Sequence, residues 1–193
     1  MLTDAGTEAT GLRPRGGWSG GVGGRGYGRG MNTTVVVRPV TETDADSLGR
    51  IHATCWHESY DHILSQAALS QLHPERLAQM WRRFSVQGPG YRHVVAELDG
   101  EIVGFAGSGP GRDAGRPTEH ELYFVYLLQA HQGTGIGQAL FDAVVDPGPT
   151  YLWVAADNPR AHRFYARNGY LPDGQERTEE VLGEPFREVR LER

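Results

Sequence analysis

A glycine-rich stretch in the middle of the chain has residue types that could bind an anion. It runs from Gln132 to Gly137 (QGTGIG) and follows an apolar and aromatic run, residues 122–128, which predicts a buried strand. Ile136, Leu140 and Val144 then recur at every fourth position, which predicts a helix. A strand, a glycine-rich turn and a helix in this order point backbone N–H groups and the positive helix end at one spot, where phosphates most often bind.

The spacing of the glycines excludes the two commonest phosphate loops. A P-loop needs a lysine after its last glycine, and all 19 Lys+Arg residues of this chain are arginines. A dinucleotide loop needs Gly-x-Gly-x-x-Gly, and after Gly133 and Gly135 the last position is held by Gln138. Two interpretations of these residues remain: another kind of phosphate site, or a tight turn that needs glycine only for its shape.

A second stretch, after a predicted strand at residues 151–156, has the markers of a short helix. Asn158 suits the N-cap, Pro159 the first helical position and Gly169 the stop. Tyr165 falls on the same face as Asn158, and an inward phenol needs a hydrogen-bond partner. Taken alone, this pattern favours a core tyrosine that is bonded to the backbone.

Taken together, Gln-x-x-Gly-x-Gly and the later Asn-x-x-Ala-x-x-Phe-Tyr-x-x-x-Gly-Tyr resemble the two halves of the GNAT superfamily signature of N-acetyltransferases. The resemblance covers roughly residues 35–172. It implies an α/β (α+β) fold with a central mixed, mostly antiparallel sheet, splayed middle strands and flanking helices. It also implies an acyltransferase that uses acetyl-CoA as co-substrate and acetylates a primary amine of a small molecule or a peptide N-terminus, by direct attack in a ternary complex.

The resemblance further implies an acetyl-CoA site made largely of backbone. The end of the central strand would bond the pantetheine and polarise the thioester, the loop amides would hold the pyrophosphate, and Asn158 would touch the pantetheine. Two positions depart from the family pattern, because relatives usually have Pro at Gln129 and Arg at Gln132. The implied cofactor-binding residues are Leu127, Leu128, Gln129, Gln132, Gly133, Thr134, Gly135, Ile136, Gly137 and Asn158.

The same resemblance implies that Tyr165 protonates the departing thiolate. A phenol with a pKa of about 10 needs help from its surroundings to protonate a thiolate whose acid has a pKa of about 8.5. The base is left open: Glu121, at the start of the central strand, either takes the amine proton through water or is an exposed residue at a strand end. His120 is the next candidate.

Trp56 and Tyr60 lie near the end of a predicted helix that opens with a Thr43-x-x-Asp46 capping box. They either pack in the core or line the acceptor pocket, as this region does in similar chains. His57 and His62 are five positions apart where a zinc-binding helix needs four, so no metal site is predicted.

Composition bounds the remaining possibilities. A net charge of -5, one cysteine and no apolar run of about 20 residues predict a cytoplasmic protein that binds neither membrane nor nucleic acid. Residues 1–30 hold 11 of the 27 glycines and are either a disordered Gly/Arg-rich tail or a mis-assigned start, with the acetyltransferase domain at 31–193.

The alternatives to an enzyme are a non-catalytic CoA-binding or regulatory module and a nucleic-acid-associated protein that acts through the tail. A homodimer is left open.

Local patterns predict the other elements: a first strand at 35–39, a helix from Pro74, a hairpin that turns at Asp99-Gly100, an exposed loop at residues 107–117 and a last strand at 188–191.

Overall fold

The computed structural model of the protein describes residues 34–84, 88–115 and 120–193. The predicted tail at 1–30 and the alternative start at Met31 lie outside the described residues. So does the end of the predicted loop at residues 107–117, from residue 116 on.

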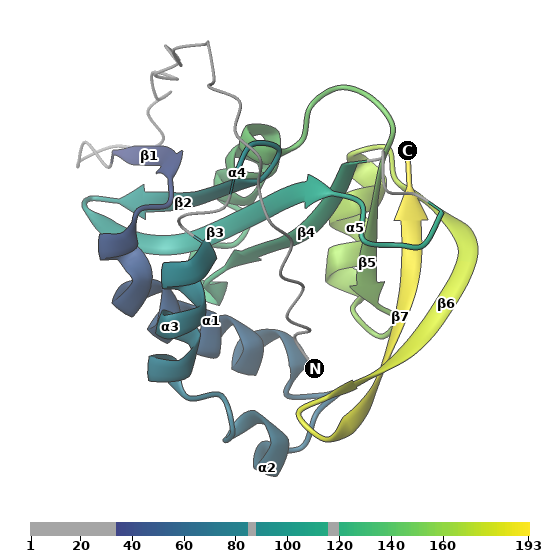
Figure 1. Ribbon diagram of the computed structural model, residues 1–193, viewed down its shortest axis with the longest axis horizontal. Coiled ribbons are helices and arrows are strands. Elements are labelled where there is room, and N and C mark those ends of the chain that lie inside the picture. Colours follow the sequence, from purple (N-terminus) through teal and green to yellow (C-terminus); the bar gives the residue numbers. More distant parts are fainter. Residues whose placement is uncertain (1–33, 85–87, 116–119) are drawn as a thin grey trace.

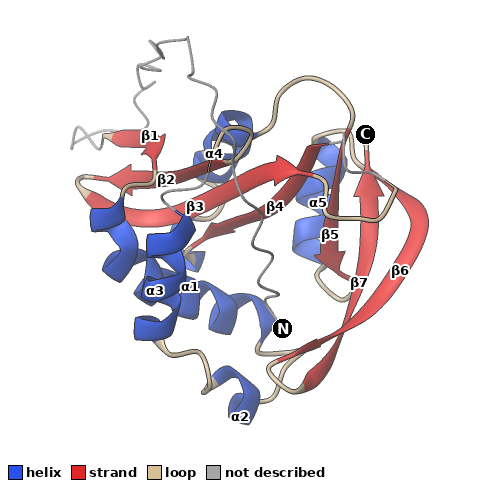
Figure 2. Ribbon diagram, viewed as in Figure 1, coloured by secondary structure: helices blue, strands red, loops and turns tan. Residues whose placement is uncertain are grey.

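A single sheet runs through the described part of the chain in the order β1-β2-β3-β4-β5-β7-β6 (Figures 1 and 2). Neighbouring strands are antiparallel, apart from β4 and β5, which are parallel. The predicted mixed, mostly antiparallel sheet is therefore confirmed. The strands are β1 Val35–Pro39, β2 Arg92–Leu98, β3 Glu101–Pro110, β4 His120–Leu127, β5 Thr150–Ala155, β6 Leu171–Val181 and β7 Glu184–Glu192.

Helices cover both faces of this sheet (Figure 2). One core cluster joins α4 and α5 to one face, and a second joins α1 and α3 to the other. No helix within the described ranges is long and apolar enough to cross a membrane. The helices are α1 Ala45–Tyr60, α2 Gln66–Leu69, α3 Pro74–Phe84, α4 Ile136–Val144 and α5 Pro159–Arg167, with short 3-10 turns η1 Glu42–Asp44 and η2 Gln129–His131.

The middle of the sheet opens between β4 and β5. These strands pair only at His120 with Thr150 and at Glu121 with Tyr151. Beyond Glu121, β4 stays paired with β3 as far as Leu127, whereas β5 pairs with β7 on its other side. The ribbons of β4 and β5 separate from this point (Figure 1). The expected splay of the middle strands is confirmed.

Local sequence signals set several of these elements. The hairpin turns at Asp99 and Gly100, both with positive φ (52° and 88°), as an Asp-Gly turn requires. The stripe Ile136, Leu140 and Val144 is buried in the core, as its spacing predicts. Helix α3 starts at Pro74 as expected.

Two predictions about elements were wrong in part, and one strand was missed. The capping box is formed by Thr41 and Asp44, two residues before the predicted pair, and it opens η1. Residues 107–110 continue β3, because Gly107 permits a close approach to the ring of Phe124 and serves no turn. Strand β6 was not predicted, since most of its side chains are exposed and polar and give no apolar alternation.

The packing of α1 on α3 yields a stability prediction. A Cβ added at Gly49 would overlap the carbonyl oxygen of Pro74 and lie 2.9 Å from the amide nitrogen of Ala78. We expect Gly49→Ala to lower the free energy of unfolding by about 1–3 kcal/mol, although alanine favours a helix by about 1 kcal/mol over glycine. Urea unfolding measures this change.

The matched control is Gly88→Ala, where an added Cβ would meet nothing within 4 Å. Its free energy of unfolding should stay near that of the unchanged protein. Equal effects of the two substitutions would contradict the proposed close contact of the helices.

Candidate active site

A cavity of about 620 Å³ fills the opening between β4 and β5. Its walls come from both strands, the glycine-rich loop, α5, the end of α1 and β7. A smaller hollow of about 300 Å³ over β1 and β2 contains none of the predicted site residues. The predicted residues that line the large cavity are Tyr60, Leu127, Gln132, Gly133, Gly135, Gly137, Asn158 and Tyr165.

The glycine-rich loop has the shape of an anion site. Gly133 and Gly135 have positive φ (82° and 90°), and a Cβ at either would meet nothing within 4 Å. Within the described part of the chain, the backbone N–H groups of residues 133–138 donate to no recorded acceptor. Helix α4 starts at Ile136, so its positive end adds to these donors. The arrangement can hold an anion through the backbone alone.

Gln132 ties this loop to the end of β4. Its Nε2 donates to the carbonyl oxygen of Leu127 at 3.0 Å. Its Oε1 is buried and has no hydrogen-bond partner among the described residues. The residue that replaces the usual arginine therefore brings no charge, but it fixes the loop against the strand and leaves one acceptor unpaired.

Positive charge reaches the cavity from α5 instead. Arg160, Arg163 and Arg167 are exposed on α5, and all three border the cavity. Two hydrogen bonds between Gln138 and Asn168 join the start of α4 to the end of α5. This link holds the last turn of α5 against the first turn of α4, where anions are favoured.

Four of the predicted cofactor-binding residues are not among those that line the cavity: Leu128, Gln129, Thr134 and Ile136. Ile136 is buried in the core, and the Thr134 hydroxyl donates to the carbonyl oxygen of His131. The N–H of Gln129 donates to Oε2 of Glu58 at 2.8 Å, so this amide already has an acceptor.

Tyr165 borders the cavity from α5, with 8% of its surface exposed. Burial raises the pKa of its phenol above the usual value, with the neighbouring Tyr60 adding to the shift, so the hydroxyl is protonated at neutral pH. No partner of this hydroxyl is recorded in the described residues. Asn158 is the N-cap of the helix, as predicted, and its Oδ1 accepts from the N–H of Ala161.

The structure separates the two predicted acceptor residues. Tyr60 lines the cavity, and its hydroxyl lies 2.9 Å from that of Tyr126. Burial, with a contribution from the negative charge of Glu188, raises the pKa of Tyr60 to about 12. Trp56 is not a lining residue and packs edge-on against Tyr60 at 5.2 Å, which places it behind the wall.

Glu121 lies at the junction where β4 and β5 part, outside the cavity lining. Its carboxylate is 1% exposed and accepts from the backbone N–H and guanidinium of Arg112 and from the Tyr151 hydroxyl. The expected exposed strand end is therefore excluded. His120, the other candidate, lies 3.4 Å from the carbonyl oxygen of Val144 through Nε2.

Sequence reasoning missed several lining residues. Tyr123, Tyr126, Trp153 and Glu188 all border the cavity. The three aromatic residues belong to the two predicted strands beside the opening. Only this position in the sequence could have identified them as lining residues. Across the described ranges, no group of three or more His, Cys, Asp or Glu side chains is placed to hold a metal ion.

A comparison with known sequence families decides the identity of this site. The profile of the acetyltransferase (GNAT) family matches residues 47–170, which contain both motifs and most of the cavity wall. The chain belongs to the GNAT family of acetyltransferases. It is an N-acetyltransferase of that superfamily, as the two motifs predicted.

Individual relatives agree with this assignment. The uncharacterized N-acetyltransferase YuaI of Bacillus subtilis is 28% identical over 164 residues, which are 81% of this chain and 91% of YuaI. The N-alpha-acetyltransferase RimI of Mycobacterium tuberculosis is 36% identical over 93 residues, 46% of this chain and 58% of RimI. The crystal structure of the PaiA N-acetyltransferase of Thermoplasma acidophilum in complex with coenzyme A has the same fold (TM-score 0.60, 18% identity, 81% of this chain and 98% of that one).

The ion pair at the strand junction, in which the Glu121 carboxylate is buried and the Arg112 side chain is more than half exposed, should contribute to stability. We expect Glu121→Gln to lower the free energy of unfolding by about 1–3 kcal/mol, because it removes charge-assisted hydrogen bonds from a buried group. Denaturant unfolding measures the loss.

Glu176→Gln is the matched control, since Glu176 also pairs with a largely exposed arginine, Arg187, but its own carboxylate is 54% exposed. It should change stability little. A control as damaging as Glu121→Gln would show that burial of the Glu121 carboxylate is unimportant.

Proposed function

We propose that the protein transfers the acetyl group of acetyl-CoA to a primary amine of a small molecule or peptide N-terminus, by direct attack in a ternary complex. The main support is the opening between β4 and β5, which carries a loop of backbone N–H groups without acceptors beside a buried, protonated tyrosine. The CoA complex of PaiA and the name of RimI, an N-alpha-acetyltransferase, also support it.

The residues present fit a nucleotide thioester. The N–H groups of residues 133–138 suit its pyrophosphate, and Arg163 and Arg167 on α5 supply the positive charge that Gln132 does not. The backbone at Leu127 and Leu128, together with Asn158, would bind the pantetheine. When bound, acetyl-CoA supplies an activated acetyl group.

Two side chains are proposed to move protons. Tyr165 would donate its phenolic proton to the departing sulfur. Its raised pKa makes the phenol a weaker acid, so the transfer would require the same dry site to raise the proton affinity of the thiolate as well. Glu121 stays the predicted base. Because its carboxylate lies outside the cavity lining and is held by Arg112, a proton could reach it only through water.

The loop geometry predicts where acetyl-CoA affinity is most easily lost. Gly135→Ala forces a side chain into a left-handed conformation and should turn the N–H groups of the loop. We expect acetyl-CoA to bind at least about 10-fold more weakly, the equivalent of 1.4 kcal/mol. Isothermal titration measures the affinity.

Gly100→Ala imposes a similar left-handed strain in the β2–β3 hairpin, also with nothing within 4 Å of the new Cβ. It should leave acetyl-CoA affinity unchanged. Absence of binding to the unchanged protein at millimolar acetyl-CoA would refute the proposed co-substrate.

The role of Tyr165 predicts a loss of turnover without a loss of binding. Tyr165→Phe should lower kcat by about 10²–10⁴-fold, because the proton donor is removed, while acetyl-CoA affinity changes little. Release of free thiol in the presence of an amine panel measures kcat.

Tyr170→Phe is the control, since Tyr170 is also buried beside α5 but bonds Thr150 and does not line the cavity. Its turnover should stay close to that of the unchanged protein. Binding of acetyl-CoA without thiol release from any amine would favour the second candidate, a non-catalytic CoA-binding module.

A further inference from the structure

The cavity wall formed by β4, β5 and β7 combines aromatic rings with one carboxylate. Tyr123 and Tyr126 come from β4, Trp153 from β5, and Tyr60 faces them from the end of α1. Glu188 on β7 is the only acidic side chain among the described residues that line the cavity. None of these groups is needed for the proposed phosphate or pantetheine contacts.

Half of the Glu188 carboxylate is available to a ligand. Nε and Nη2 of Arg177 both contact its Oε2, each at 2.7 Å. In the described residues, Oε1 has no recorded partner. The side chain is 16% exposed, so the free oxygen lies in a partly dry setting where a charged hydrogen bond is stronger than in water.

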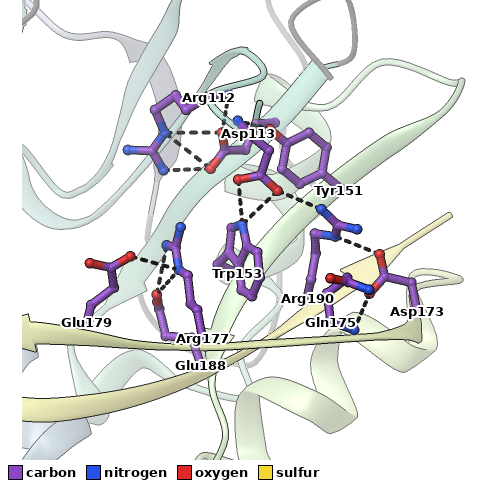
Figure 3. A network of polar contacts seen from close by, with 11 residues as sticks. Arg112, Asp113, Tyr151, Trp153, Asp173, Gln175, Arg177, Glu179, Glu188 and Arg190 are labelled. Carbon is purple, nitrogen blue, oxygen red and sulfur yellow. Dashed lines mark hydrogen bonds and ion pairs between the residues drawn. The ribbon is translucent and has the colours of Figure 1, made fainter. Parts of the chain in front are cut away.

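A chain of contacts fixes the direction of this carboxylate (Figure 3). The Arg177 guanidinium lies 4.2 Å from the centre of the Trp153 ring, and Nε1 of that ring donates to Asp113. Arg190 in turn bonds Asp113 and Asp173. Glu188 is therefore held by a guanidinium that is itself stacked on a hydrogen-bonded indole. These contacts keep the carboxylate, and with it the free oxygen, in one orientation.

A carboxylate among aromatic faces recognises a cation. The amine that reacts must be neutral, because only its free lone pair can attack. An ammonium bound to Glu188 is instead kept protonated by the opposite charge. The group that binds at Glu188 is therefore not the amine that is acetylated.

Tyr60 connects this wall to the proposed proton donor. Its hydroxyl bonds that of Tyr126, and Tyr60, Glu188 and Tyr165 all line the same cavity. One small ligand that contacts Tyr60 can thus reach the carboxylate with one end and the reacting centre with the other.

We propose that the acceptor is a small amine with a second positive charge, and that the Oε1 atom of Glu188 binds this second charge beside the Tyr60 ring. The proposal rests on the proposed function, since it assigns the acceptor class of the same site. Glu188 is then the residue that determines specificity, and Arg177 positions it.

Two probes with the same four-carbon chain separate the second charge from the alkyl chain: 1,4-diaminobutane and butylamine. We expect the full-length protein to bind the diamine about 10- to 100-fold more tightly than the monoamine, measured by isothermal titration with and without CoA. Glu188→Gln should abolish this preference. In turnover, the same change should raise KM for the diamine and leave kcat within about 3-fold.

The matched control is Glu179→Gln. Glu179 is the other carboxylate that pairs with Arg177, at 3.6 Å, but it is exposed and does not line the cavity. The diamine preference should survive in this variant. Unchanged acetyl-CoA affinity of Glu188→Gln shows that the variant is folded.

Equal affinities of the two amines for the unchanged protein, or a preference that survives Glu188→Gln, would overturn the inference. So would a failure of the diamine to bind. These outcomes do not depend on acetyl transfer, which the acetyl-CoA titration and thiol release test separately. A failure of the proposed function and a failure of this inference are therefore distinguishable.

Discussion

The short pairing between β4 and β5 is the constraint on which the rest of the site depends. After two residue pairs the strands separate, and backbone groups that a continuous sheet would pair are left to other partners. Such an opening in the middle of a sheet is costly unless something holds its sides and something fills it. Arg112, Glu121 and Tyr151 form a bonded cluster where the strands part, and the cavity beyond can be filled by a ligand that hydrogen-bonds to strand edges.

The structure holds the open end through uncharged side-chain amides. Gln132 bonds the last carbonyl of β4, and Gln138 bonds Asn168 across to α5. These contacts set the loop and the end of α5 against each other before any ligand is present, so less ordering is needed on binding. The positive charge of the site then comes from exposed arginines of α5. Because these side chains stay hydrated, their charge carries little desolvation cost in the absence of an anion.

The parts of the site that could be predicted are those that neighbouring residues determine. Positive φ at Gly133 and Gly135, the N-cap at Asn158 and the apolar stripe of α4 each follow from a few adjacent residues. The splay of the strands could be predicted only through the family resemblance. By contrast, the pairing of Glu121 with Arg112 depends on how the loop after β3 folds back, which no local spacing reports. Strand β6 was not predicted for a different reason. Its exposed polar residues pair with β7 through backbone hydrogen bonds, and such pairing does not require an apolar alternation in the sequence.

The two sides of the cavity differ in what they are made of. The loop side offers backbone N–H groups to an anion, and the directions of these groups are set by the glycine conformations and the start of α4. The other side is built from side chains on α1, β4, β5 and β7, such as Tyr60, Trp153 and Glu188. A substitution there changes the chemistry of the wall without moving a strand, whereas a substitution in the loop changes the backbone itself. In the proposed function, the side chains of this wall would select the acceptor, because the fold alone cannot supply its identity.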